Sequence, residues 1–405
     1  IFIISVLCKN FMWLKETYAP TVNQTQSKEK VTLLPKTVND LAIVASDADT
    51  MEIFIGDIAK EKPTRFSPQE LESFTRKYSK RLGSGGFGVV YKGKFPNGVQ
   101  LAVKVLKNCA TKELKEQFMA EVSTIGRTYH KNLVRLYGFC FDTNIKALVY
   151  EYMEKGSLDC ILFDNNKSLE WEKLHEIAIG TAKGLGYLHH DCKDIIIHYD
   201  IKPGNVLLDS KFSPKVADFG LAMLYNREIT HVSMTCGRGT PGYAAPELWI
   251  PSHITYKCDV YSYGITLFEI ALGKMKLDAT MSVSQLPRKV WEKFERGELS
   301  DFLRDFGIKD RDRMKAVLFC TVALWCIQYL PEERPSMIRV VQMLEGMVEV
   351  MTPPNPFQHL ISSGVNLAVS KQTTSGDSTR SAGIRRTSSK ECTPIMKKYE
   401  IEIAS

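Results

Sequence analysis

Several residues that could do chemistry are gathered in one short segment, residues 198–205 (HYDIKPGN), and a further acid follows at Asp218. Carboxylate and amide oxygens are hard ligands, and Mg²⁺ prefers a few of them together with the phosphates of a substrate. Asn205 and Asp218 are therefore candidate magnesium ligands. Within the same segment, Asp200 can accept a hydroxyl proton and Lys202 can balance charge on a transferred group. A single Asp-Gly turn is common on protein surfaces, so only the combination of these residues indicates a functional site.

A glycine-rich stretch with the spacing GxGxxG precedes this segment. Glycine lets backbone N–H groups approach a phosphate closely, because no Cβ intervenes. A dinucleotide-binding fold needs a helix directly after the glycines, whereas here residues 89–91 and the turn at Asn97-Gly98 continue a β-hairpin. The pattern favours a hairpin flap over a nucleotide, with a plain flexible turn as the alternative. The candidate nucleotide-binding residues of this stretch are Gly83, Ser84, Gly85, Gly86, Phe87 and Gly88.

A lysine and a glutamate stand where charged side chains are not expected. Lys104 interrupts an apolar strand-like run, and Glu121 lies on the apolar stripe of a predicted helix. Burying an unpaired ammonium or carboxylate is costly, so each needs a partner. We expect the two to pair, which leaves Lys104 positioned to contact phosphate oxygens. Taken singly, each could instead be an edge residue whose charge reaches solvent.

The spacing of apolar residues predicts the elements that carry these side chains. Residues 80–106 alternate in strand fashion around one turn, which predicts two hairpin strands and a third strand, Leu101–Leu106. Apolar residues at spacings of three and four predict a helix over about residues 111–127. Two further strand-like runs, Leu133–Phe141 and Ala147–Tyr152, complete a small antiparallel sheet with one helix.

After Gly156 the pattern becomes helical, and loops rich in Asp, Gly and Pro separate the predicted helices. This predicts an α+β protein of two lobes, a small antiparallel β-sheet lobe with one helix and a larger mainly helical lobe, with a ligand cleft between them. We place this domain at residues 64–352, with the N-lobe over about 64–152 and the C-lobe over about 153–352. The predicted C-lobe helices cover residues 171–189, 256–272, 314–328 and 336–350.

The composition is that of a globular protein, with 405 residues of which 44% are hydrophobic and 24% are charged. Disordered, collagenous and disulfide-scaffold classes are thereby excluded. The net charge of +7 is mild and no basic stripe is interleaved with aromatics, so we expect no nucleic-acid partner. The 10 cysteines form no CxxC pair and no metal-ligand spacing with His, which is typical of free thiols in a reducing compartment.

Both ends of the chain differ from this domain. Residues 1–15 combine a short apolar run with a basic and aromatic flank, which predicts the inner end of a truncated transmembrane helix. A frayed terminus or the remains of a signal peptide are the alternatives. Residues 16–63 are polar and are interpreted as a juxtamembrane linker. Residues 353–405, rich in Ser and Thr, are interpreted as a disordered tail.

Together these residues resemble the motifs of the eukaryotic protein kinase family, in the family's own order. The resemblance covers about residues 79–350 and implies the two-lobed kinase fold, with ATP and Mg²⁺ as cofactors. The motifs are the glycine stretch, the strand lysine in Ala102-Val103-Lys104, the helix glutamate Glu121, a variant His-Arg-Asp loop ending in Asn205, then Asp218-Phe219-Gly220 and Ala245-Pro246-Glu247.

The resemblance gives the candidate residues roles toward the nucleotide. It implies that residues 83–88 cover the ATP phosphates, and that Lys104, held by Glu121, orients the α- and β-phosphates. Asn205 and Asp218 would bind magnesium. The residues that match the adenine pocket are the apolar Val90, Ala102 and Leu207, with Tyr150 at the back of the pocket and the hinge running from Glu151 to Met153.

On the substrate side, the resemblance implies that Asp200 orients the substrate hydroxyl and takes its proton. Lys202 makes the segment similar to the serine/threonine version of the loop, and Thr240 matches the threonine that contacts this lysine. Protein substrates with Ser or Thr acceptors follow. Three further matches are interpreted as structural, namely the buried ion pair of Glu247 with Arg334, and Asp259, which holds the catalytic loop (residues 198–205).

Within the family, the chain resembles plant receptor-like serine/threonine kinases related to the rust-resistance receptor kinases. The residues that carry this resemblance are 81–88, 198–209 and 238–247. Members place an extracellular domain and one membrane helix before the kinase. A single-pass plasma-membrane protein with a cytosolic signalling kinase domain is therefore expected, with receptor or co-receptor kinases as further partners. A free cytoplasmic kinase is the alternative.

One residue departs from the usual family pattern. Tyr199 stands where most kinases have arginine, so the cation that would bind a phosphate on the activation segment (residues 218–247) is missing. We therefore expect activity to depend little on phosphorylation of Thr230, Ser233 or Thr235, and their joint replacement by Ala tests this.

Two functions from different classes are compatible with the sequence. The first is an active ATP-dependent protein serine/threonine kinase, whose transition state needs positioning and charge stabilisation more than covalent help. The second is a pseudokinase or scaffold that binds nucleotide and partner proteins without turnover. The intact set of Lys104, Asp200, Asn205 and Asp218 favours the first, because the loss of any one would favour the scaffold.

Overall fold

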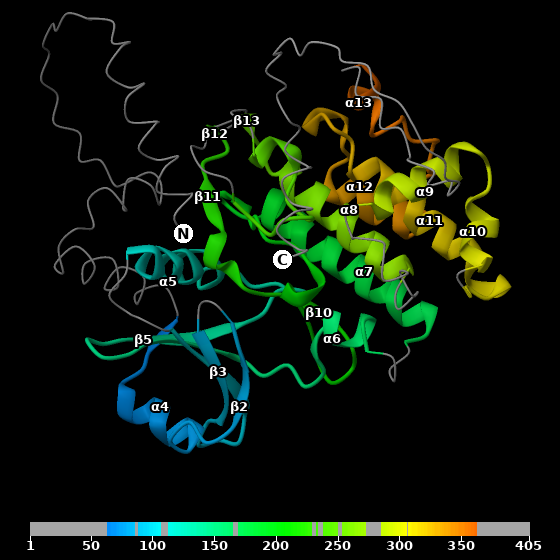
Figure 1. The fold of residues 1–405 in the computed structure, drawn as a ribbon. Helices are drawn as coiled ribbons and strands as arrows, with labels where there is room; N and C mark the ends of the chain where they lie inside the picture. The colour runs from blue at the N-terminus through cyan, green and yellow to red at the C-terminus, as the bar shows by residue number, and fades with distance from the viewer. Residues whose placement is uncertain are drawn as a thin grey trace, which may run out of the picture. The chain divides into compact units, whose positions relative to one another are not determined.

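The computed structural model describes residues 63–85, 88–106, 112–164, 169–228, 232–233, 238–249, 253–272, 285–305 and 307–362 (Figure 1). The sequence predictions for residues 1–62 and 363–405 lie outside these ranges, as do those for Gly86, Phe87, Thr230 and Thr235. The described residues up to His359 belong to one compact unit.

The small lobe is built on a six-stranded sheet in the order β1-β5-β6-β4-β3-β2. All neighbours pair antiparallel except β1, which runs parallel to β5. The predicted hairpin and third strand are confirmed, and the later strand-like runs form β5 and β6. The strands are β1 (Thr64–Arg65), β2 (Arg81–Ser84), β3 (Gly88–Lys94), β4 (Gln100–Leu106), β5 (Leu136–Phe141) and β6 (Lys146–Glu151).

The central strand β4 has two different faces, because side chains alternate along a strand. Leu101 and Val103 are fully buried and pack on the side of helix α4 (Pro68–Thr75). Ala102 and Lys104 point to the opposite face of the sheet. The strand therefore uses one face for the lobe's core and offers the other to the residues of the site.

Two helices complete the small lobe. Helix α5 (Lys112–Ile125) agrees with the helix predicted over 111–127 and buries Phe118 and Val122. The sequence analysis does not predict α4, although its signal is local. The backbone N–H of Glu70 donates to Oγ of Ser67 at 3.3 Å, and the carboxylate of Glu70 accepts from the backbone N–H of Ser67 at 2.7 Å. This reciprocal pair is a capping box, which begins a helix.

The larger lobe is mainly helical, and α8 runs through its centre with nearly every residue buried. The predicted helix over 171–189 is regular only to Gly186 and continues as a π-turn, and the one predicted over 336–350 ends at Leu344. The helices are α6 (Asp159–Leu162), α7 (Trp171–Gly186), the π-turn Tyr187–Asp191, α8 (Lys257–Leu272), α9 (Leu286–Glu295), α10 (Leu299–Asp305), α11 (Asp310–Cys326), α12 (Met337–Leu344) and α13 (Gln358–Ser362).

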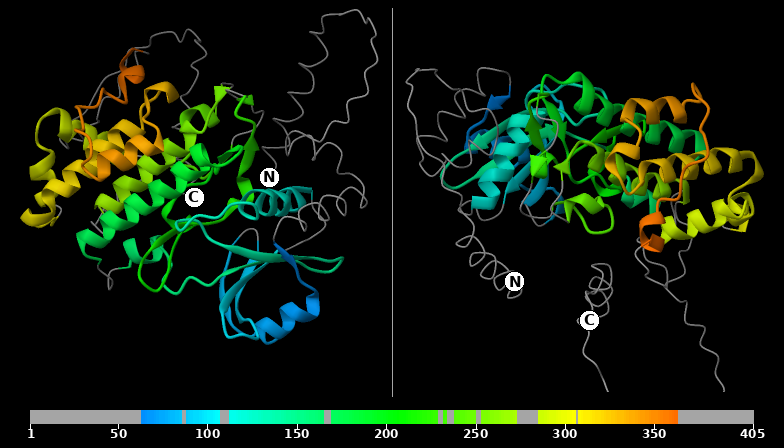
Figure 2. Two further views of the ribbon diagram at one scale, coloured as in Figure 1. Left: turned by 180° about the vertical axis from the view of Figure 1, so that it is seen from behind. Right: turned by 90° about the horizontal axis from the view of Figure 1, so that it is seen from above.

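Short strands and 3₁₀ turns, rather than long elements, lie within or next to the catalytic loop and the activation segment. A three-stranded sheet has the order β10-β9-β7, and β11 pairs antiparallel with β8. The bounds are β7 (Gly156–Ser157), β8 (Ile195–Ile197), β9 (Val206–Leu208), β10 (Pro214–Val216), β11 (Met223–Tyr225), β12 (Val232–Ser233) and β13 (His253–Ile254), with 3₁₀ turns at Pro203–Asn205, Phe219–Leu221, Pro246–Leu248 and Pro331–Glu333. From behind, α5 lies between the N-lobe strands and β11 (Figure 2).

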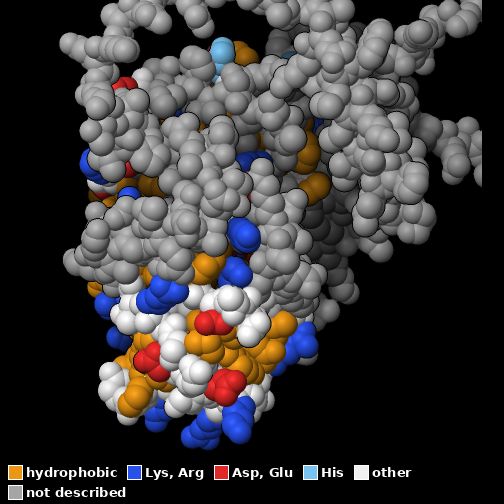
Figure 3. Space-filling model, turned by 90° about the vertical axis from the view of Figure 1, so that its left-hand side faces the viewer, with side chains coloured by type: hydrophobic (Ala, Val, Ile, Leu, Met, Phe, Trp, Pro, Cys, Tyr) orange, Lys and Arg blue, Asp and Glu red, His pale blue; other side chains and the backbone are white. Residues whose placement is uncertain are grey.

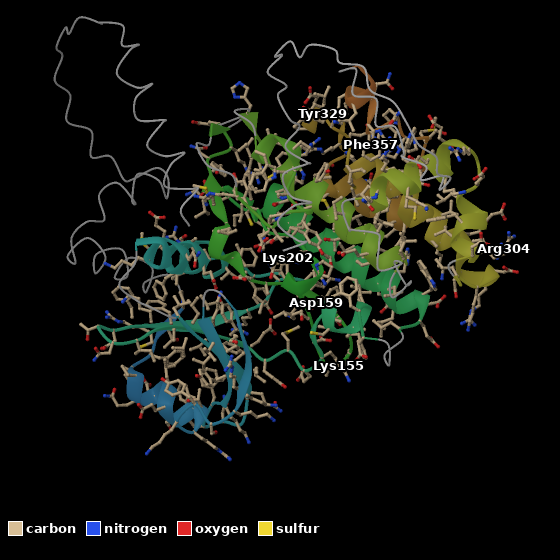
Figure 4. All side chains as sticks on the ribbon, viewed as in Figure 1. Lys155, Asp159, Lys202, Arg304, Tyr329 and Phe357 are labelled. Carbon is tan, nitrogen blue, oxygen red and sulfur yellow. The ribbon has the colours of Figure 1, made fainter. Side chains whose placement is uncertain are left out.

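The chain after α12 differs from the expectation of a disordered tail beginning at residue 353. The indole N–H of Trp325 donates to the carbonyl of Met351 at 2.8 Å, and the Gln328 amide donates to that of Pro354 at 3.0 Å. The ring of His359 stacks on Tyr329 with centroids 3.8 Å apart. Figure 4 shows Tyr329 and Phe357 at the same end of the C-lobe. Residues 351–359 thus follow the C-lobe surface, because backbone carbonyls and rings find partners on and just after α11.

The surface of the described part of the small lobe mixes acidic and basic side chains with apolar ones on the face seen in Figure 3.

Among the described residues, no helix combines the length and the apolar character needed to cross a bilayer.

Candidate active site

Lys104 joins three elements. Its ammonium Nζ contacts Oε1 of Glu121 from α5 and lies 2.8 Å from Oδ1 of Asp218, which follows β10. Burial by itself would lower the pKa of this lysine, but the two carboxylates raise it above its usual range. The pairing expected from the sequence is therefore present, and a third residue, Asp218, shares the lysine.

Glu121 has a second partner that the sequence analysis does not predict. The hydroxyl of Tyr150, on β6, donates to Oε2 of Glu121. Burial raises the pKa of Glu121, whereas the charge of Lys104 opposes the rise. A Cβ added at Gly220 would lie 3.2 Å from Oε1 of the same carboxylate, so the chain after Asp218 passes close to α5.

Asp218 begins a tight turn with left-handed backbone, at φ +66°. Burial would raise the pKa of its carboxyl, but Lys104 outweighs burial and the pKa lies below its usual value. The next residue, Phe219, is fully buried and packs edge-on against the ring of His198 at 4.7 Å. The turn is thereby fixed against the catalytic loop.

The backbone of the catalytic loop is held by one buried carboxylate. Oδ2 of Asp259, on α8, accepts from the N–H of His198 at 2.8 Å, and Oδ1 accepts from the N–H of Tyr199 at 2.8 Å. The ring of His189 lies 3.0 Å from the same carboxylate. Tyr199 takes a positive φ of +67°, a conformation that costs energy in a non-glycine residue. Asp259 stabilises that conformation, in agreement with its expected structural role.

Asp200, Lys202 and Thr240 form a closed set of hydrogen bonds. The ammonium of Lys202 donates to Oδ2 of Asp200 at 2.8 Å and to the hydroxyl of Thr240 at 2.6 Å. The same hydroxyl donates to Oδ1 of Asp200 at 2.5 Å. Both carboxylate oxygens are thus oriented by groups from two segments. Figure 4 shows Lys202 on the C-lobe side of the boundary with the N-lobe sheet.

Asn205 is oriented by the same carboxylate. Its amide nitrogen donates to the backbone carbonyl of Asp200 at 2.8 Å and to Oδ2 at 3.0 Å. The backbone carbonyl of Asn205 accepts from the N–H of Ala217 at 2.9 Å, so Asn205 lies beside the residue that precedes Asp218. With the nitrogen turned to Asp200, the amide oxygen is the atom left for a ligand.

A magnesium ion fits this donor set as a substrate-bound ion. Among the described residues, no group of three or more His, Cys, Asp or Glu side chains is arranged to hold a metal. Mg²⁺ is commonly bound through one or two protein oxygens together with substrate phosphates and waters. Asn205 and Asp218 offer such oxygens on adjacent segments.

The described glycines of the GxGxxG stretch fall into two kinds. A Cβ at Gly83 or Gly85 would meet nothing within 4 Å, whereas one at Gly88 would lie 2.4 Å from the carbonyl oxygen of Val105. Gly88 is thus required by the packing of β3 on β4. Gly83 and Gly85 leave room for a phosphate to approach the backbone.

The residues expected around the adenine occupy one region of the sheet and the β9 strand. Val90 and Ala102 are partly buried on the face of the sheet that carries Lys104, and Leu207 is partly buried on β9. Met153 is buried after β6. The carboxylate of Glu151 accepts from Lys215 at 2.9 Å, and its backbone N–H donates to the carbonyl of Arg135 at 3.0 Å.

Two further arrangements escape the sequence analysis. The hydroxyl of Tyr243 donates to both oxygens of the buried Glu269, at 3.0 and 2.9 Å. Burial raises the pKa of Glu269 to about 7. The signal was present, because Glu269 is an acid within the apolar run of α8, like Lys104 in β4. The second is a contact between the hydroxyls of Tyr199 and Tyr225, for which we find no sequence signal.

The predicted pair of Glu247 and Arg334 forms a bidentate, buried ion pair. Nη1 donates to Oε1 at 2.6 Å and Nη2 donates to Oε2 at 2.8 Å. The guanidinium also donates to the backbone carbonyls of Gln328, Lys257 and Tyr329. The charge is therefore fully partnered, which burial of an ion pair requires.

Fold and site together define a protein kinase domain. A profile of the family described as protein tyrosine and serine/threonine kinase matches residues 76–344. The chain belongs to this family.

Its relatives are plant receptor-like serine/threonine kinases. The chain is 41% identical to Rust resistance kinase Lr10 of Triticum aestivum, over 76% of this chain and 49% of that protein. It is 42% identical to the G-type lectin S-receptor-like serine/threonine-protein kinase At1g34300 of Arabidopsis thaliana, over 78% of this chain and 39% of that protein. A second Arabidopsis thaliana protein of this type, SD2-5, is 46% identical over 72% of this chain and 36% of its own length. The chain thus spans about half or less of the length of these relatives.

Proposed function

We propose that this chain is an ATP-dependent protein kinase that transfers the γ-phosphate of Mg-ATP to serine and threonine hydroxyls of proteins. The observation that carries the proposal is the hydrogen-bonded set of Asp200, Lys202 and Thr240. A carboxylate with both oxygens oriented is suited to align a substrate hydroxyl and to accept its proton. Lys202, a few ångströms from that carboxylate, can offset negative charge on the transferred group.

On the nucleotide side, Lys104 is the proposed phosphate-binding cation. It is held between Glu121 and Asp218, so its ammonium is already positioned when the nucleotide arrives. The described glycines of residues 83–88 would contribute backbone N–H groups above the phosphates. Asn205 and Asp218 would hold magnesium, which when bound neutralises charge on the phosphate oxygens.

The adenine would lie between the two lobes. In this proposal Val90, Ala102 and Leu207 pack on its faces, and the backbone from Glu151 to Met153 forms its hydrogen bonds. The kinship with receptor-like kinases supports a cytosolic signalling domain of a membrane receptor, with receptor or co-receptor kinases among its partners.

The experiment compares the full chain with Asp200→Asn and Lys104→Met for transfer of labelled γ-phosphate to the chain itself and to a basic protein substrate. We expect transfer to Ser and Thr only, dependent on added Mg²⁺, and reduced at least about a hundredfold in Asp200→Asn. Nucleotide binding should persist in Asp200→Asn and weaken in Lys104→Met. A folded wild-type chain that binds Mg-ATP with no transfer above that of Asp200→Asn would support the scaffold instead.

A further inference from the structure

Tyr199 lies at the centre of a small apolar cluster that is separate from the main core. Its side chain is 1% exposed, although the residue sits in the catalytic loop between His198 and the proposed base Asp200. The cluster contains residues from the catalytic loop, the activation segment and α8. Its buried members are Ile197, Tyr199, Met223, Tyr225, Ala245, Leu248, Ile254 and Cys258.

The hydroxyls of Tyr199 and Tyr225 lie 2.7 Å apart in this cluster. Tyr225 is 5% exposed and ends β11, the first strand of the activation segment. Its hydroxyl also donates to Sδ of Met223 at 3.1 Å. Because a tyrosine hydroxyl has one proton, Tyr199 is then the donor to Tyr225. Burial raises the pKa of both, so both remain neutral donors and acceptors.

The later part of the activation segment meets the same residue. The guanidinium of Arg238 lies 6.0 Å from the ring centroid of Tyr199, and its Nη1 donates to the carbonyl of Leu221 at 3.3 Å. A Cβ at Gly239 would lie 2.6 Å from the carbonyl oxygen of Tyr199, so only glycine allows this approach. Both described ends of the segment therefore converge on Tyr199, and Thr240, the partner of Asp200, follows directly.

We propose that the Tyr199–Tyr225 hydroxyl pair holds the start of the activation segment against the catalytic loop without any phosphate, and that the two tyrosines are positioning residues for phosphotransfer. This inference rests on the proposed function. A cation at position 199 would need an anion from elsewhere, whereas a neutral donor finds its acceptor within the chain. The pair is one hydrogen bond in a buried apolar cluster, where leaving either hydroxyl unpaired is costly.

The test uses the full chain after phosphatase treatment, with Tyr199→Phe, Tyr225→Phe and the double variant. Each change keeps the ring and removes one hydroxyl. We expect kcat to fall about tenfold in each single variant, with KM for ATP within about twofold, and the double variant to fall no further. Backbone amide hydrogen exchange over residues 223–225 should accelerate in all three.

Tyr263→Phe is the matched control. Tyr263 is equally buried in α8, and its hydroxyl donates to the carbonyl of Ala178 at 2.9 Å, away from the activation segment. It should lose stability while kcat and exchange over residues 223–225 stay unchanged. Wild-type kcat and exchange in both single variants, or fully additive losses in the double variant, would overturn the proposal. If the wild-type chain transfers no phosphate, the proposed function fails, and exchange over residues 223–225 alone decides whether the pair holds the segment.

Discussion

The hydroxyl of Thr240 donates to Oδ1 of Asp200 at 2.5 Å, across 40 residues of sequence. This bond links the activation segment directly to the carboxylate that we propose as the base. The orientation of that carboxylate therefore depends on where the segment lies. Lys202, which donates to both residues, keeps the charge of the carboxylate balanced.

Replacing Thr240 by Val removes the hydroxyl and keeps the shape of the side chain. We expect kcat to fall by about ten- to a hundredfold, because Oδ1 of Asp200 loses the Thr240 hydroxyl that orients it, with KM for ATP little changed. Thr240→Ser, which retains the hydroxyl, is the control and should keep most of the activity. Steady-state kinetics with Mg-ATP check this, and an unimpaired Thr240→Val would mean that Lys202 and Asn205 orient the carboxylate sufficiently without the hydroxyl.

The two kinds of glycine in the GxGxxG stretch should respond differently to alanine. Gly88→Ala places a Cβ 2.4 Å from the carbonyl oxygen of Val105, so β3 and β4 must separate, at a cost of about 1–3 kcal/mol. Gly85→Ala meets nothing within 4 Å and should leave the free energy of unfolding unchanged. In Gly85→Ala we expect a raised KM for ATP instead. Urea denaturation and nucleotide titration separate the two effects, and equal stability of both variants would contradict them.

The buried ion pair of Glu247 and Arg334 should matter far more than a surface pair. Glu247→Gln leaves a buried guanidinium without its counter-charge, and we expect a loss of about 3–5 kcal/mol in the free energy of unfolding. The control is Glu176→Gln, whose exposed carboxylate pairs with Lys173 on α7, and which should cost less than about 0.5 kcal/mol. Chemical denaturation measures both losses, and similar values would contradict the larger contribution that we expect from the buried pair.

Glu269 should give the protein a measurable pH dependence of stability. Burial raises its pKa from 4.5 to about 7, so between these values the folded chain holds a proton that the unfolded chain has released. Stability is therefore highest below pH 4.5, as far as this group is concerned, and falls as pH rises through 7, by about 3 kcal/mol in all.

Glu269→Gln should remove this part of the dependence while keeping an acceptor for Tyr243. The measurement is the free energy of unfolding of both proteins at several values between pH 5 and pH 8. As pH rises, the free energy of unfolding of the wild type should fall relative to that of Glu269→Gln. A difference that does not vary with pH would mean that Glu269 is ionised throughout.

Much of the site can be predicted from the sequence because it places charged residues at positions where apolar residues are expected. A lysine in an apolar strand and a glutamate on an apolar helix face demand partners, and Lys104 and Glu121 do meet. The catalytic loop can also be predicted, because its acid, lysine and amide lie within a few residues of one another in the sequence. Secondary structure with a clear period, such as α5 or the β3–β4 hairpin, is predicted for the same reason.

The contacts that sequence reasoning missed join distant segments through ordinary residues. Nothing in the sequence relates Tyr199 to Tyr225, since buried tyrosines are common and the pairing depends on how β8 and β11 lie. The capping box of Ser67 and Glu70 is different, because it is a local signal that the sequence does contain.

Residues 351–359, which follow the C-lobe surface, affect where the protein can be shortened at its C-terminal end. A boundary at residue 352, where the composition changes, would divide the segment between Met351 and Pro354 and remove the carbonyl that Gln328 binds. It would also remove His359, whose ring stacks on Tyr329. A shortened protein ending near residue 362 keeps these contacts and is the better starting point for crystallisation.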